Sequence, residues 1–209
     1  MITDKIKIDS QGKGLEDALR EVERFCEYRR FTPAQSLRMR LLAEETISMI
    51  RELSNDFTGE FWASGEGETC SLNVEGRALM TDDRREALMD VSSSGKNLLA
   101  KGVLGKIATF FDQGLSQAPY APGAGVMDYG LMSADMAVAT NPIYANCAIW
   151  SLRQYRSNVN AAYAAGEAET LGEAWDELQK SIIANVADDV QVGVLGGKVR
   201  MVVSKRFPE

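Results

Sequence analysis

The clearest hydrophobic pattern lies between residues 15 and 53, where apolar side chains recur every three or four positions. A helix over 15–30 is predicted by the spacing of Leu15, Leu19, Val22 and Phe25. A second helix is expected to run from Pro33 to about Leu53. Thr32 is its expected cap, and Pro33 occupies the first helical position, which tolerates the missing amide hydrogen.

Alternating apolar and polar residues predict strands at both ends of the chain. The first is expected at residues 5–8, where Ile6 and Ile8 alternate with lysines. One hairpin is predicted from residues 60–65 and 69–75, and a closing hairpin from 189–195 and 198–206, joined by Gly196 and Gly197. Helical spacing also predicts helices over 82–91, 98–115, 143–165 and 170–186.

The order of these elements defines the expected fold class. A strand, two helices, a hairpin, more helices and a last hairpin predict an α+β two-layer sandwich. Its sheet is expected to be mixed but mostly antiparallel, with helices on one face. We interpret 1–209 as a single domain in which residues 115–180 form a loop and helical insertion. Within it, residues 117–141 are rich in glycine and proline and are expected to pack as a lid or a loose insertion.

The composition of the chain excludes several kinds of functional site and argues against some classes of partner. The 209 residues carry a formal net charge of -7, which argues against a nucleic-acid or membrane partner. Histidine is absent, which removes histidine bases and histidine metal sites. The three cysteines are widely spaced, as in a reducing compartment. No apolar run reaches the ~20 residues of a membrane span, and no signal peptide is visible, so we expect a cytoplasmic protein.

Two adjacent carboxylates stand in the middle of the second helix. At about 100° per residue, Leu37, Leu41, Glu44 and Ser48 share one stripe, and Glu45 lies between that stripe and Met49. A carboxylate that packs against apolar side chains has a higher proton affinity and can act as a general base. The alternative is that Glu44 and Glu45 form the solvated side of an amphipathic helix.

The segment Ala43-Glu-Glu-Thr-Ile-Ser-Met-Ile-Arg-Glu-Leu53, followed by a hairpin, resembles the ATP-binding domain of the GHKL superfamily. Anti-sigma-factor serine kinases, histidine kinases and gyrase belong to it, and the anti-sigma branch is the most similar. The resemblance covers residues 1–112 and 180–206. It implies ATP and Mg²⁺ as ligands, a glutamate that activates water or a hydroxyl, and an asparagine four residues later that holds the metal.

The chain departs from this pattern at the metal position. If Glu44 is the catalytic glutamate, Ser48 stands where asparagine is expected; if Glu45 is, Met49 does. A serine hydroxyl is a poor magnesium ligand, and a thioether is too soft to be one. We therefore expect no metal site.

Two other stretches correspond to nucleotide-binding motifs of the family. Glu75-Gly76 is the nearest string to the adenine-binding motif, Asp-x-Gly-x-Gly. Gly102 and Gly105 are candidates for a phosphate-binding helix start, where free N–H groups attract anions. Each stretch also has a purely structural interpretation. Glu75-Gly76 is also typical of a turn that ends a strand, and Gly102 and Gly105 are also typical of closely packed helices.

Three functional hypotheses follow. The first is a degenerate GHKL domain without catalytic activity, a regulatory protein of the anti-sigma-factor type that acts through protein contacts. The second is an active serine kinase or ATPase with divergent motifs. The third is a module that binds a non-nucleotide ligand or oligomerises. We favour the first, with a protein partner, contacts expected at residues 115–180, and a homodimer as one option.

Overall fold

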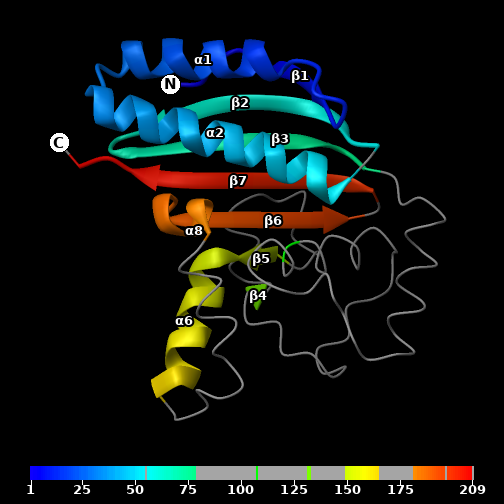
Figure 1. The fold of residues 1–209 in the computed structure, drawn as a ribbon, viewed down its shortest axis with the longest axis vertical. Coiled ribbons are helices and arrows are strands. Elements are labelled where there is room, and N and C mark those ends of the chain that lie inside the picture. Colours follow the sequence, from blue (N-terminus) through cyan, green and yellow to red (C-terminus); the bar gives the residue numbers. More distant parts are fainter. Residues whose placement is uncertain are drawn as a thin grey trace.

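A computed structural model describes residues 1–54, 56–78, 107, 131–132, 149–164, 181–195 and 197–208. Together they form an α+β fold in which four helices pack with one antiparallel sheet (Figure 1). The helices are α1 (Leu15–Tyr28), α2 (Pro33–Leu53), α6 (Leu152–Ala164) and α8 (Ile182–Val186). The strands are β1 (Ile6–Asp9), β2 (Thr58–Glu66), β3 (Thr69–Arg77), β4 (Leu131–Met132), β5 (Ile149–Ser151), β6 (Asp189–Leu195) and β7 (Lys198–Arg206).

The sheet runs in the order β1-β2-β3-β7-β6-β5-β4. Each pairing between these strands is antiparallel, which replaces the mixed sheet expected from the sequence. Both predicted hairpins, β2–β3 and β6–β7, are confirmed, and β3 pairs with β7 along nine residues of each strand. The two hairpins therefore form the centre of the sheet although more than 100 residues separate them in the chain.

One predicted helix is wrong at its start. The spacing favours a helix over 143–165, but Ile149–Ser151 is strand β5, and α6 begins only at Leu152. β5 pairs with β6, so this stretch of the expected helical insertion belongs to the sheet. The helices predicted over 82–91 and 98–115 lie outside the described residues, apart from helical Ile107, and so does the insertion predicted over 117–141, apart from β4. Of the helix predicted over 170–186 the structure describes only the end, where α8 begins after the extended cap residue Ser181.

The helices α1 and α2 lie against each other on one face of the sheet, with α8 next to α2 (Figure 1). Neighbouring strands present one continuous row of buried side chains to this face: Phe61, Val74, Met201, Val192 and Trp150. Gly65 shows that this row points toward the helices. It lies on the same face of β2 as Phe61, four residues away, and it packs against the Phe25 ring of α1. The hydrophobic core is the layer between this row and the helices.

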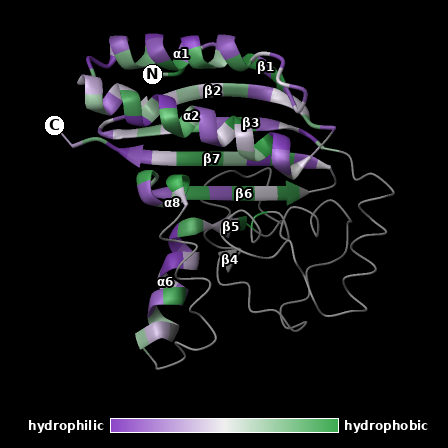
Figure 2. Ribbon diagram, in the orientation of Figure 1, coloured by the Kyte–Doolittle hydropathy of each residue, from purple (hydrophilic) through white to green (hydrophobic). Residues whose placement is uncertain are grey.

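The opposite face of the sheet is polar. Its central row is Trp62, Asn73, Val202, Gln191 and Ser151. The Lys5 ammonium lies 4.4 Å from the centre of the Trp62 ring, a cation–π contact. Hydrophilic and hydrophobic residues alternate along the central strands (Figure 2), as expected for an antiparallel sheet with one face on the core.

Two facing glycines allow an aromatic ring to lie directly on the sheet. Gly59 and Gly76 are opposite each other on β2 and β3. A Cβ at either position would lie 2.6 Å from Cζ of Phe57, and a Cβ at Gly76 would lie 2.4 Å from the Thr58 carbonyl oxygen. Both positions therefore exclude larger residues.

Within the described part of the chain, no helix is long and apolar enough to cross a bilayer.

Candidate functional site

The helix that carries the two carboxylates starts as predicted. The Thr32 hydroxyl accepts a hydrogen bond from the Gln35 amide at 3.3 Å, and the Gln35 side-chain oxygen accepts one from the Thr32 amide at 2.9 Å. This reciprocal pair is a capping box, with Pro33 in the first turn. It fixes the start of α2 and hence the direction of each side chain along its 21 residues.

Glu44 takes part in a surface ion-pair network. Arg40 Nε donates to Glu44 Oε1 at 3.0 Å, and the same guanidinium contacts Glu23 of α1. The Glu44 side chain is 43% exposed. Glu44 therefore lies on the outer side of α2 toward α1, where exposed ion pairs contribute about 0–1 kcal/mol to stability. This placement agrees with the solvated alternative for Glu44.

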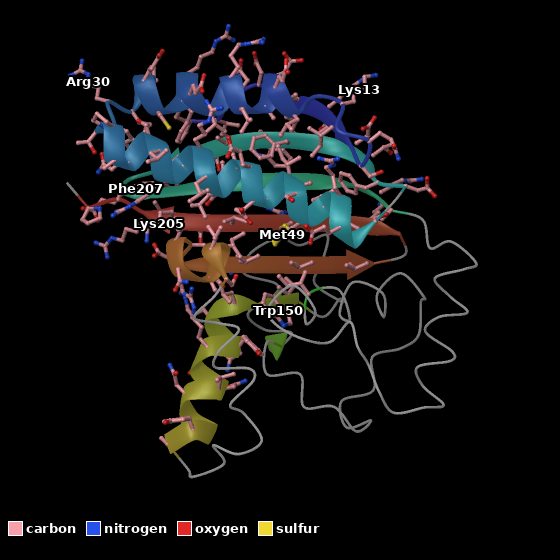
Figure 3. All side chains as sticks on the ribbon, viewed as in Figure 1. Lys13, Arg30, Met49, Trp150, Lys205 and Phe207 are labelled. Atoms are coloured by element: carbon pink, nitrogen blue, oxygen red, sulfur yellow. The ribbon has the colours of Figure 1, made fainter. Side chains whose placement is uncertain are left out.

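Glu45 and Met49 occupy a different side of the helix. Glu45 is turned about 100° from Glu44, to the flank of α2 that faces away from α1, and is half-buried. Met49, one turn further, is 2% exposed and lies between α2 and the sheet (Figure 3). Ser48 is exposed. The structure thus separates the two candidate pairs: Glu44 and Ser48 lie outward, whereas Glu45 borders the buried Met49.

The structure does not bring Glu75, the acidic residue of the predicted adenine motif, to the same side of the sheet as α2. Glu75 alternates with the buried Val74 and so belongs to the polar face, in register with Glu60 and Arg200. Gly76 is accounted for by the close approach of β2 and the Phe57 ring. Gly102 and Gly105 lie outside the described residues.

The two described cysteines are poorly suited to nucleophilic chemistry. Burial raises the pKa of the Cys26 thiol to about 11, although a hydrogen bond with Ser36 acts in the opposite direction. Burial also raises the pKa of Cys70, and the nearby Arg29 only partly offsets it. Because the thiolate is the reactive form, both thiols are expected to be unreactive near neutral pH.

A buried aspartate, which sequence reasoning missed, joins β6 to the start of α6. Asp189 is 3% exposed and accepts hydrogen bonds from the Ser151 hydroxyl at 3.0 Å and the Arg153 amide at 2.9 Å. Gln191 Nε2 donates to its other oxygen at 3.0 Å. Three donors compensate the burial of this carboxylate. The sequence signal was the acidic pair Asp188-Asp189 directly before an apolar strand.

Charged side chains surround this aspartate. The Arg156 guanidinium lies 3.4 Å from the Ala187 carbonyl oxygen. Burial lowers the pKa of Arg156, while Asp189 and Asp188 act against that shift. The geometry holds α6 against β6 and has the character of a helix cap rather than a ligand site.

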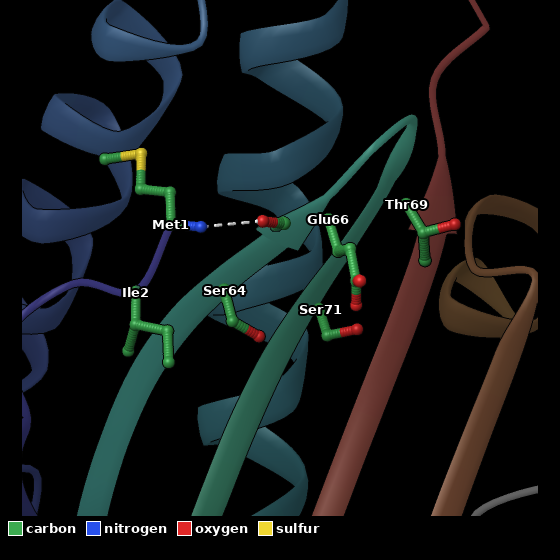
Figure 4. Close-up of a pocket in the computed structure, with 7 residues that line it drawn as sticks. Met1, Ile2, Ser64, Glu66, Thr69 and Ser71 are labelled. Carbon is green, nitrogen blue, oxygen red and sulfur yellow. Dashed lines mark hydrogen bonds between the residues drawn. The ribbon is translucent and has the colours of Figure 1, made fainter.

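A hollow of about 810 Å³ lies on the polar face at the turn end of the β2–β3 hairpin (Figure 4). It is lined by Met1, Ile2, Ser64, Gly65, Glu66, Thr69 and Ser71. The terminal ammonium group donates to the Gly65 carbonyl oxygen at 2.9 Å. Hydroxyl groups and one carboxylate suit hydrogen bonding to a polar ligand and offer little for a phosphate group.

Among the described residues, no three cysteine, aspartate or glutamate side chains converge as they would around a metal ion. Comparison with protein-family models, curated proteins and solved structures finds no match for this chain.

Proposed function

We propose that this chain is a degenerate GHKL-type domain that regulates a protein partner through direct contacts, with magnesium-dependent nucleotide chemistry weakened or lost. The order of its elements supports the proposal. A long helix with a central glutamate pair precedes hairpin β2–β3, and a closing hairpin β6–β7 pairs with β3. This is the order that the sequence resemblance implies.

We infer the loss of metal chemistry chiefly from the position of Met49. It stands four residues after Glu45 on the same side of α2 and is 2% exposed within the core. Mg²⁺ requires oxygen ligands in octahedral geometry, and a thioether supplies none. In the other alignment, Glu44 takes the position of the glutamate and Ser48 that of the asparagine. Ser48 is exposed, and Glu44 forms an ion pair with Arg40, so this pair does not form a metal site either.

Calorimetric titration of the full chain with ATP, with and without Mg²⁺, tests this proposal. We expect either no binding or weak binding that Mg²⁺ leaves unchanged. Tight ATP binding that requires Mg²⁺ would overturn the proposal. A phosphoryl-transfer assay with labelled ATP complements the titration: activity that Glu45→Gln abolishes and Glu44→Gln preserves would assign the chain to the active kinases or ATPases instead.

The regulatory half of the proposal has its own test. A protein that co-purifies with the chain from its source cells is isolated and titrated against it, with and without ATP. We expect a complex of fixed stoichiometry whose affinity does not depend on nucleotide. Complex formation that requires ATP would contradict the proposal.

A further inference from the structure

The outer side of α2 carries a seam with coiled-coil spacing. Its residues follow one another at intervals of three and four: Ala34, Leu37, Leu41, Glu44 and Ser48. They lie opposite the buried side of the helix. Leu37 is 67% exposed and Leu41 is half-buried, so two leucines of one helix face solvent. Single exposed leucines are common, but here they are centred on a seam with ordered charges beside it.

The charges beside the seam divide α2 into two halves of opposite sign. The first half carries Arg38 and Arg40 and no acidic residue. The second half carries Glu44, Glu45 and Glu52 against a single Arg51. Along the flank away from α1, Arg38, Glu45 and Glu52 follow at intervals of seven, so they form one row. The row begins positive and continues negative.

When two copies of this row run in opposite directions, the positive part of each copy lies beside the negative part of the other. A two-fold axis perpendicular to the helix brings the same flank of two antiparallel helices together and places the first half of one against the second half of the other. We propose that a second copy of this chain docks on the outer side of α2 in this antiparallel arrangement. Arg38 of each copy then faces Glu45 of the other, and Leu41 lies near the two-fold axis.

The apolar seam is small, so the charges determine the orientation and much of the strength of this contact. Two symmetric ion pairs form at the edge of the interface, where salt screens them. The ion pair between Arg40 and Glu44 stays within each copy on the opposite flank. We therefore expect a dimer in rapid exchange that dissociates as the salt concentration rises. This inference goes beyond the proposed function, since it holds whether or not nucleotide binds.

Sedimentation velocity of the full chain over a range of protein concentrations, at low and high salt, tests the dimer. Arg38→Glu and Glu45→Arg each place like charges opposite each other, twice per dimer. We expect each variant to weaken dimerisation by about tenfold or more. The double variant R38E/E45R restores opposite charges across the two-fold axis, and we expect it to recover dimerisation.

Lys13→Glu is the matched control, because it makes the same charge change at the start of α1, far from the first turn of α2 (Figure 3). We expect it to leave dimerisation unchanged. A monomer at every concentration would overturn the proposal. So would a dimer that Arg38→Glu does not weaken, or one that the double variant fails to recover, since each outcome places the interface elsewhere. Circular dichroism of each variant confirms that it is folded.

Discussion

Two neighbouring rows of the same sheet differ in almost every respect. The row that faces the helices, from Phe61 across to Trp150, is entirely apolar and buried. The next row, from Trp62 across to Ser151, mixes an indole, amides and a hydroxyl. The backbone is shared, so only side-chain parity separates the two environments. Stability should therefore depend chiefly on the first row. In the second row it should depend on the buried polar members, Asn73 and Ser151, whereas substitutions at its more exposed positions should chiefly change what the surface can bind.

Alanine at two consecutive positions of β2 gives the largest expected contrast. Phe61→Ala empties a site that is 0% exposed in the helix-facing row, and we expect it to reduce the free energy of unfolding by about 3–5 kcal/mol. Trp62→Ala removes a half-buried ring from the polar face and should cost clearly less. Urea unfolding followed by far-ultraviolet circular dichroism measures both. Equal losses would show that the polar face is also covered.

A methyl group on the helix-facing side should also be costly. Gly76→Ala would place a Cβ 2.4 Å from the Thr58 carbonyl oxygen and against the Phe57 ring. We expect a loss of about 1–3 kcal/mol in the free energy of unfolding. The control is Gly67→Ala at the tip of the hairpin, where φ is +54° and no atom lies within 4 Å of the new Cβ. It should cost about 1 kcal/mol from backbone strain alone. A loss for Gly76→Ala no larger than that of the control would refute the close approach of β2 and β3.

The smallest contrast is between the ion pairs of the two faces. Lys205, at a helix-facing position of β7, donates to Asp188 at 2.7 Å, whereas Lys5 contacts Glu60 on the polar face at 3.1 Å. Burial alone would raise the pKa of Asp188. Hydrogen bonds from Lys205 and from the Arg206 amide outweigh it and lower the pKa below its ordinary value.

The sign of the pH effect follows from that direction. A lowered pKa in the folded state stabilises the protein at neutral pH, and this contribution is lost as the pH falls through the pKa of the folded carboxyl. We expect Asp188→Asn to lower the urea midpoint at pH 7 and to have little effect at strongly acidic pH. Glu60→Gln should cost no more than about 1 kcal/mol at either pH. A pH-independent loss for Asp188→Asn would rule out the ion pair as its cause.

Local signals predicted the parts of the fold that local interactions determine. Thr32 and Pro33 fix the start of α2 within a few residues, and both hairpins have glycine in their turns. Strand β5 could not be found this way, because Ile149–Ser151 is a strand through its pairing with β4 and with β6, and β6 lies about 40 residues further along the chain. A short apolar run fits a helix equally well when its partner is unknown.

In the candidate site, too, the sequence predicted only what local interactions determine. The sequence placed Glu44 and Glu45 on one helix but could not decide which of them faced solvent. That depends on Arg40, which reaches Glu23 on a different helix. Gly76 looked like part of a binding motif because the ring of Phe57, which directly precedes the other strand of the hairpin, was not visible in the local pattern.

The position of Asp189 has a consequence for the order of folding. An isolated helix of 13 residues is marginal in water, and a cap at its first turn does much to nucleate it. Here the carboxylate at the Arg153 amide comes from 36 residues further along the chain. During synthesis, α6 therefore has only its local cap, the Ser151 hydroxyl that accepts from the Gln154 amide at 3.3 Å, until Asp189 of β6 has emerged. We expect α6 and β6 to become protected from hydrogen exchange in the same kinetic phase of refolding.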